Sequence, residues 1–219
     1  MFPNLGEDLR HYGGAGRQLK ALLLVPRVWA IVVYRFRRWT HAARLPSILC
    51  LPLSAVGSLV AYFVEAATHI ELPPQTIIGP GLFLPHAGYV IVASNAIIGR
   101  HCTLTQGVTI GHRAGGREVS FDSPVIGDRV YVGPGAAILG PVNVGHDVLI
   151  GANAVVLNSV SPRAVVVGNP ARVISMQGSF NLISYPSMKY DAERLMSLAE
   201  VQGGETRDIE NGTRHHQLD

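Results

Sequence analysis

The sequence predicts a mainly β protein, a parallel β-helix with a helical region before it and a polar tail after it. The first observation is a six-residue repeat, in which aliphatic residues occupy positions 126, 132, 138, 144, 150 and 156 without interruption. The second is that a small apolar residue follows each of them by four positions, from Val130 to Val160. The third is the abundance of glycine (24) and proline (14), which excludes long helices throughout the chain. A period of six fits neither an α-helix nor a plain strand and is typical of parallel β-helices.

The N-terminal region, residues 1–75, is expected to be helical. Residues 19–39 are apolar with interspersed arginines, and residues 45–64 contain no charged residue. Twenty uncharged positions meet the length of a membrane span, but two prolines and a glycine within them weaken that interpretation. We therefore expect a buried helix packed against a neighbouring helix or a second subunit, with peripheral membrane contact through residues 20–65 and a true span as the alternatives.

Basic residues are concentrated at the N-terminus, where positions 1–45 carry eight Lys or Arg and two acidic residues. The middle of the chain is neutral, which argues against a nucleic-acid-binding stripe, whereas an anionic membrane surface or ligand stays open. Positions 1–20 lack the apolar core of a signal peptide. Two cysteines, Cys50 and Cys102, exclude a disulfide framework and a multi-cysteine metal site. We expect a cytoplasmic protein without a metal, at the inner face of the membrane if the N-terminus binds lipid.

The β-helix is assigned to residues 76–175. Each hexad supplies one short strand whose aliphatic residue points inward, and three hexads close one triangular coil, so residues 126–161 make two full coils. The register breaks between Ile110 and Ile126, where a step of sixteen inserts about ten extra residues. This inserted loop, 111–125, is rich in glycine and charge, and such loops on rigid scaffolds usually carry binding or catalysis.

Residues 176–219 are predicted to be a polar tail, in which 191–201 form one helix and the positions after 203 are disordered. Within the repeat, His101 and His146 fall at outward turn positions, so both are expected to be solvated. Cys102 falls at an inward position and is expected to be a small core residue rather than a nucleophile.

Four segments carry a family resemblance: the hexads, LPHAGYVIV, QGVTIG with its following glycine-rich loop, and VVVGNPARVI. Together they resemble the hexapeptide-repeat acyltransferases, and within them the serine acetyltransferase-like branch. The resemblance covers residues 70–175 well and the N-terminal helices loosely. It implies a left-handed parallel β-helix, assembly as homotrimers or dimers of trimers, and acyl transfer from acyl-CoA at sites between neighbouring subunits.

The resemblance also implies roles for individual residues. His86 matches the catalytic base, and Glu71, fifteen positions earlier, matches the aspartate that orients this base. Pro85 stands where serine acetyltransferases have an aspartate beside that histidine. Asp122 and Ser123 stand where the family has an Arg-His pair that grips the carboxylate of serine. The base and its partner are therefore kept, whereas the residues that recognise serine are changed.

Acetyl-CoA is the expected co-substrate. We assign its contacts to the GNPAR turn, to two repeat turns and to the inserted loop: Arg113, Gly133, Ala152, Gly168, Pro170 and Arg172. His112 opens the inserted loop and is a second candidate for base or substrate contact. For Arg113, as for Arg117, a solvated loop position is an equal alternative.

These residues predict an O-acetyltransferase that acts on a hydroxyl of a sugar or of a polysaccharide or glycolipid precursor. His86 would take the proton of the attacking hydroxyl while Glu71 holds the other ring nitrogen, without a covalent acyl-enzyme. The alternative is a serine O-acetyltransferase. A zinc carbonic anhydrase of this fold would need a histidine where Arg117 stands, and a non-catalytic scaffold would bind no acetyl-CoA.

Overall fold

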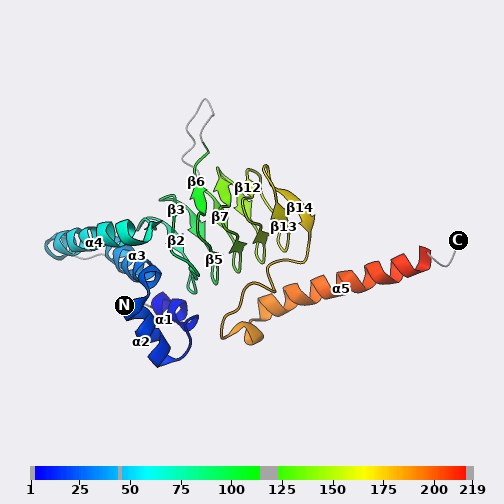
Figure 1. Ribbon diagram of the computed structural model, residues 1–219, viewed down its shortest axis with the longest axis horizontal. Coiled ribbons are helices and arrows are strands. Elements are labelled where there is room, and N and C mark those ends of the chain that lie inside the picture. Colours follow the sequence, from blue (N-terminus) through cyan, green and yellow to red (C-terminus); the bar gives the residue numbers. More distant parts are fainter. Residues whose placement is uncertain (1–2, 44–45, 114–122, 216–219) are drawn as a thin grey trace. The chain divides into compact units, whose positions relative to one another are not determined.

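Six-residue spacing becomes three-sided coils in the structure, a computed structural model that describes residues 3–43, 46–113 and 123–215. The chain divides into two units, Met1–Tyr185 and Pro186–Asp219. The first unit contains the helical N-terminal region and the β-helix, whose coils stack along one axis (Figure 1). The hexads are in register along that axis, because each strand pairs with strands of the coils before and after it.

Three sheets run the length of the β-helix, and consecutive strands from β1 to β13 fall into different sheets. The first sheet contains β1 (Ile70–Glu71), β3 (Val90–Val92), β6 (Thr109–Gly111), β9 (Ala137–Leu139) and β12 (Val155–Val156). The second contains β2 (Ile77–Ile78), β4 (Ile97–Ile98), β7 (Val125–Ile126) and β10 (Asn143–Val144). The third contains β5 (Thr103–Leu104), β8 (Tyr131–Val132), β11 (Leu149–Ile150), β13 (Val165–Val167) and the antiparallel β14 (Arg172–Ser175).

The aliphatic position of each hexad points inward, as the repeat predicts. Ile126, Val132 and Ile138 are all buried, and so are the small residues four positions later. Burial of apolar surface between coils is the main stabilising contribution in such a stack, since a single coil cannot cover its own core. The break in the hexad register does not break the ladder, because Ile98 pairs in parallel register with Ile126. The insertion therefore falls between the end of β6 and the start of β7 without shifting the pairing of the strands on either side.

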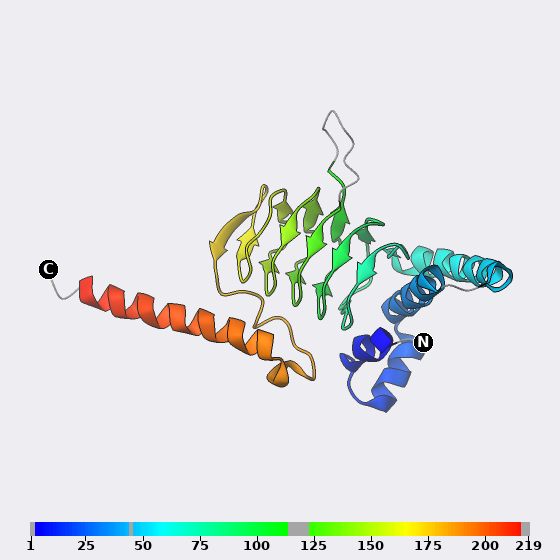
Figure 2. The same ribbon diagram turned by 180° about the vertical axis from the view of Figure 1, so that it is seen from behind.

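Four helices precede the first coil: α1 (Pro3–Arg10), α2 (Ala15–Leu24), α3 (Pro26–Ala42) and α4 (Ser47–Thr68). Proline at the first position of α3 suits a helix start, since its missing N–H is not needed there. His69 caps the C-terminal end of helix α4, because it has the left-handed conformation and donates its N–H to the carbonyl of Glu65 at 2.7 Å. Strand β1 follows at once, so α4 leads directly into the β-helix (Figure 2).

A buried ion pair joins the helices to the first coil. Arg35 of α3 donates from Nε to Asp8 of α1 at 2.8 Å, and the two side chains are 5% and 0% exposed. Arg35 also donates to the carbonyls of Ile78 and Gly79, each at 2.6 Å. Asp8 accepts from the backbone N–H of Leu82 at 2.9 Å. Every charged atom of the pair is therefore satisfied, which a buried pair requires.

Within one chain, helix α4 is buried on one side only, and packing of its other side against a second subunit stays a prediction. It packs on α3 with small residues, of which Gly57, Ala61 and Thr68 are buried. A Cβ at Gly57 would meet Phe36 at 3.0 Å, so glycine permits the close approach of the two helices. Most of the large apolar side chains of α4 point the other way and are exposed, with Val64 as an exception that packs against the core. The segment Ile48–Thr68 also meets the length and composition of a membrane span.

The segment after β14 folds back on the β-helix instead of starting a free tail at 176. Ser179 donates its N–H to the carbonyl of Asp147 at 2.9 Å and its hydroxyl to the carbonyl of Arg129 at 2.6 Å. Tyr185 stacks on His101 with ring centroids 3.8 Å apart. His101 is consequently buried, so the expectation that it is solvated was wrong.

In the second unit, η1 (Met188–Tyr190) precedes α5 (Ala192–His215). Asp191 precedes the first turn of α5 and accepts from the backbone N–H of Arg194 at 3.1 Å, as an N-cap aspartate does. The predicted helix over 191–201 is therefore present, and it continues beyond 203, where disorder was expected.

Candidate functional site

Most of the residues predicted to bind or react with acetyl-CoA lie along one edge of the three-sided β-helix. This edge consists of the turns that follow successive rungs of the third sheet, and we call it the His86 edge: 85–89, 105–108, 133–136, 151–154 and 168–171. Backbone hydrogen bonds stack these turns, as from Gly107 to Gly88 at 3.0 Å and from Gly135 to Gln106 at 3.0 Å. The first and last turns are four inter-strand spacings apart, a distance of about 19 Å along the β-helix axis. The edge can thus hold one elongated ligand with its reactive end at one terminal turn.

His86 lies at the first turn of this edge and is exposed. Its loop leaves the β-helix after the buried Leu84 and returns at the buried Val90. Gly88, at φ +117°, donates its N–H to the carbonyl of Thr68 at 3.0 Å. The end of α4 therefore fixes the loop that presents the His86 ring to solvent.

Glu71 lies on β1, where its side chain is exposed and its backbone is in register with Ile91 of β3. No hydrogen bond joins Glu71 to His86 in the described part of the chain. The negative charge of Glu71 instead acts on Glu65, whose pKa is raised by burial and by Glu71 although Arg37 opposes the rise. The orienting contact between Glu71 and His86 stays a prediction.

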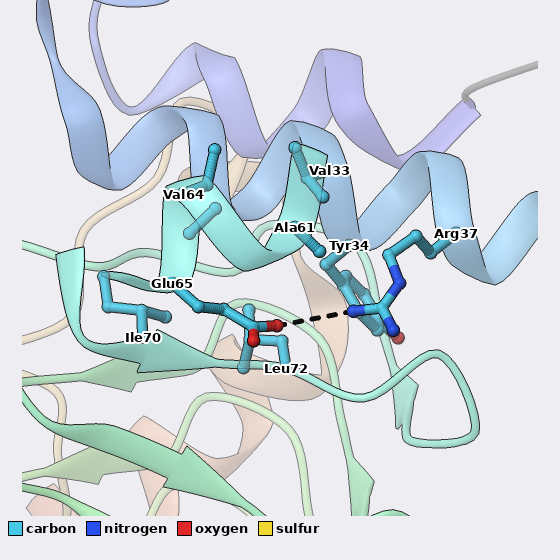
Figure 3. Close-up of a pocket in the computed structure, with 9 residues that line it drawn as sticks. Val33, Tyr34, Arg37, Ala61, Val64, Glu65, Ile70 and Leu72 are labelled. Atoms are coloured by element: carbon cyan, nitrogen blue, oxygen red, sulfur yellow. Dashed lines mark hydrogen bonds and ion pairs between the residues drawn. The ribbon is translucent and has the colours of Figure 1, made fainter. Parts of the chain in front are cut away.

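Glu65 belongs to a small apolar pocket between α3, α4 and β1 (Figure 3). Its carboxylate faces Arg37, with Oε1 3.3 Å from Nη1. The space beside them has room for no more than about one water molecule, so the pocket is not a substrate site.

Apart from Arg113, the predicted CoA contacts lie along the His86 edge, from its middle turn to its last. Gly133 donates its N–H to the carbonyl of Ile150 at 2.8 Å, and a Cβ there would lie 2.8 Å from the backbone N of Ala152. Gly168, at φ +93°, begins the final turn and accepts from the N–H of Val155 at 2.9 Å. The same turn contains Pro170, and the exposed Arg172 follows it. These residues share one edge with His86, and their contact with acetyl-CoA stays a prediction.

His112 and Ser123 lie on a different edge, between the first and second sheets. His112 follows β6 directly and is exposed, and Arg113 beside it packs against Gly140, where a Cβ would meet the Cβ of Arg113 at 3.1 Å. The Ser123 hydroxyl is buried and has no hydrogen-bond partner among the described residues. Asp122 and Arg117 lie outside the described residues. Within one chain, the whole width of the first sheet separates His112 from His86.

Sequence reasoning did not single out three exposed side chains beside His86. The rings of His69 and Tyr89 contact each other in a tilted arrangement, with centroids 4.7 Å apart, where the loop meets the end of α4. Gln106 occupies the next turn of the edge, and its Cβ is the nearest atom to a Cβ built at Gly88, 3.9 Å away. Gln106 is the first residue of the QGVTIG segment and could have been noticed there, whereas nothing in the sequence indicated the ring pair.

Cys102 is a core residue, as expected. Its thiol is fully buried, and burial raises the pKa of Cys102 to about 12, so a nucleophilic thiolate is not available. Its Sγ donates to the carbonyl of Gly127 at 3.2 Å. His146, by contrast, keeps an exposed ring, and its Nδ1 accepts from the N–H of Asp128 at 2.9 Å. Across residues 3–43, 46–113 and 123–215 no three His, Cys, Asp or Glu side chains cluster as metal ligands.

Comparison with known proteins identifies the repeat and similar sequences. Residues 123–158 match the family model described as "Bacterial transferase hexapeptide (six repeats)". The chain is 34% identical over 182 residues to a serine acetyltransferase of Synechococcus elongatus, covering 81% of this chain and 70% of that protein. It is 37% identical over 172 residues to a serine acetyltransferase of Helicobacter pylori, covering 78% of this chain and 95% of that protein.

Solved structures show the same fold. The serine acetyltransferase of Brucella abortus in complex with coenzyme A aligns with a TM-score of 0.67 at 27% identity, covering 80% of this chain and 68% of that chain. The serine acetyltransferase of Neisseria gonorrhoeae in complex with serine aligns with a TM-score of 0.62 at 25% identity, covering 78% and 67%. The predicted left-handed parallel β-helix is confirmed.

Proposed function

The chain belongs to the hexapeptide-repeat acyltransferase family, and from this membership we propose that it transfers acetyl from acetyl-CoA to an acceptor hydroxyl at His86. One observation carries the assignment of the site: His86 and the GNPAR turn occupy the two ends of a single edge. An elongated acyl-CoA lying along this edge would bring its thioester to the exposed imidazole.

The proposed reaction is a direct displacement. One ring nitrogen of His86 takes the proton of the acceptor hydroxyl while its oxygen attacks the thioester carbonyl carbon. Backbone N–H groups at a turn of the edge stabilise the resulting oxyanion. When the tetrahedral intermediate collapses, the C–S bond breaks and the CoA thiolate receives the proton from His86. The products are the acetyl ester and free CoA.

We assign Glu71 to the second ring nitrogen of His86, where it would stabilise the imidazolium that forms during attack. This role requires the Glu71 side chain to turn from Glu65 toward the loop of His86. The strand that carries Glu71 supports the role, since β1 lies beside β3 and the loop of His86 leads directly into β3.

We propose L-serine as the first acceptor to test. The relatives and solved structures reported above are named serine acetyltransferases, and this supports serine over the sugar hydroxyl favoured by the sequence. A sugar or glycolipid hydroxyl is the second candidate because Pro85 and Ser123 replace residues that recognise serine. The small Ser123 hydroxyl cannot provide a cation for a carboxylate.

The assembly we propose is a homotrimer whose sites lie between subunits, as in trimeric members of this family. The separation of His86 from His112 and Ser123 supports it, since a site that uses both edges needs a neighbouring subunit. A cytoplasmic location is part of the proposal, in agreement with the unpaired Cys50 and Cys102.

Thiol release from acetyl-CoA tests the acceptor. The full chain is supplied with L-serine in one arm and with a panel of sugars and nucleotide sugars in the other. Turnover with L-serine alone supports the first candidate, and turnover with a sugar alone supports the second. An absence of acetyl-CoA binding by calorimetry would refute the proposed function itself.

A further inference from the structure

We propose that the outward face of α4 docks on an anionic lipid surface. The proposal is independent of the proposed function. It rests on the distribution of apolar side chains around α4, which is the reverse of that in an ordinary surface helix. A surface helix of a globular protein normally turns its large apolar side chains toward the core. Helix α4 turns small residues toward α3 and places its large apolar residues outside, between 43% and 82% exposed: Ile48, Leu49, Leu51, Val56, Leu59, Val60, Tyr62 and Phe63.

The width of this face favours lipid over a single partner helix. At 100° per residue, the eight outward side chains span an arc of about 180° around α4. A partner helix needs a stripe of about 100°, whereas lipid contacts every outward side chain at once. The sequence over residues 45–64 contains no charge that would have to be desolvated there.

Charge complementarity points to an anionic surface. Helix α2 exposes three leucines, Leu19, Leu23 and Leu24, together with Arg17 and Lys20. These five residues fall within an arc of about 160° on α2. A face that combines leucines with basic residues is typical of helices that lie at a membrane interface. The N-terminal 45 residues as a whole carry eight basic and two acidic residues, and anionic lipids attract such segments.

The packing of α4 on α3 indicates a helix that lies on the bilayer rather than one that crosses it. Arg37 of α3 pairs with Glu65 of α4 at 3.3 Å, and Arg38 of α3 donates to the carbonyl of Pro74 at 3.1 Å. If α4 crossed the membrane, α3 and these charged groups would have to enter the hydrocarbon with it, at high cost. With α4 at the interface, its outward face enters the lipid and α3 stays on the aqueous side.

Vesicle flotation of the full chain tests the proposal. The anionic vesicles contain phosphatidylcholine with about 30% phosphatidylglycerol, which gives them a negative surface potential. Vesicles of pure phosphatidylcholine are the neutral comparison. We expect flotation with the anionic vesicles and a fall in the partition coefficient of at least about tenfold for the double variant Leu59→Asn, Phe63→Asn. The matched control is Leu182→Asn, because Leu182 is 51% exposed and lies outside the helical region; it should float like wild type.

A second double variant, Arg17→Gln with Lys20→Gln, tests the electrostatic contribution of α2 to lipid binding. Two lost charges should weaken binding to anionic vesicles by about 25-fold, at roughly fivefold for each charge. Circular dichroism checks that each variant is folded, and light scattering reports its mass. Flotation that is equal for wild type and the α4 variant overturns the proposal. The proposal is also overturned if the wild type does not float and the α4 variant has a lower molecular mass than the wild type by light scattering. That result would assign the outward face of α4 to contact with a second copy of this chain.

Discussion

The ion pair between Asp8 and Arg35 should be the most sensitive point in the attachment of the helices to the β-helix. The substitution Asp8→Ala leaves the Arg35 guanidinium, 5% exposed, without its counter-ion and the N–H of Leu82 without its acceptor. Removing one partner of a buried ion pair costs about 3–5 kcal/mol. An unsatisfied backbone N–H adds to the loss, so we expect the free energy of unfolding to fall by at least about 3 kcal/mol.

Chemical denaturation followed by circular dichroism measures this effect. The control lies on the same helix: Glu7 forms an ion pair with the exposed Arg10, three residues away. Breaking such a surface pair through Glu7→Gln should cost less than about 1 kcal/mol. If Asp8→Ala were no more destabilising than Glu7→Gln, the pair would not be the anchor that the structure indicates.

Three further predictions concern the β-helix. Cys102 should not react with a thiol reagent at pH 8 in the folded protein, since burial raises its pKa to about 12, whereas denaturant should expose it to labelling; labelling of folded Cys102 would contradict its place in the core. Gly133→Ala should lower the free energy of unfolding by about 1–3 kcal/mol, because the new Cβ would meet the backbone N of Ala152 at 2.8 Å; a variant as stable as wild type would refute the close stacking of these turns. The pKa of Asp128 is lowered because hydrogen bonds and the charge of Arg100 outweigh the effect of burial. The ionised Asp128 should therefore stabilise the fold above the ordinary pKa of a carboxyl group. This stabilisation should be lost as the pH falls through the lowered pKa of Asp128. Asp128→Asn should therefore reduce the stability difference between pH 7 and pH 2, and an unchanged difference would exclude this role.

The β-helix could be predicted from the sequence because its determinants are local and repeated. The six-residue spacing identifies the inward-pointing residue of each hexad, so the burial of Ile126 or Val132 could be predicted from spacing alone. The inserted residues could also be located, since the step of sixteen leaves the pairing of Ile98 with Ile126 intact.

Features that depend on distant parts of the chain could not be predicted in the same way. His101 looks solvated in the repeat and is buried because Tyr185, 84 positions later, stacks on it. Helix α4 looks like a core helix by composition, and only its contact with α3 shows that Gly57 and Ala61 are the buried side. Spacing in sequence brings Glu71 to β1 and His86 to the loop that leads into the neighbouring β3, but it does not set the rotamer that would join them.

Acetyl transfer by a His86→Ala variant tests the central assignment most directly. The rate of thiol release from acetyl-CoA is measured at saturating acceptor, with His41→Ala as the control because His41 is an exposed histidine on α3. Loss of a general base typically lowers the rate by 10²–10⁴-fold. We predict a fall of about that size for His86→Ala and none for His41→Ala. A His86→Ala enzyme within about threefold of wild type, far short of what loss of a general base produces, would contradict the account.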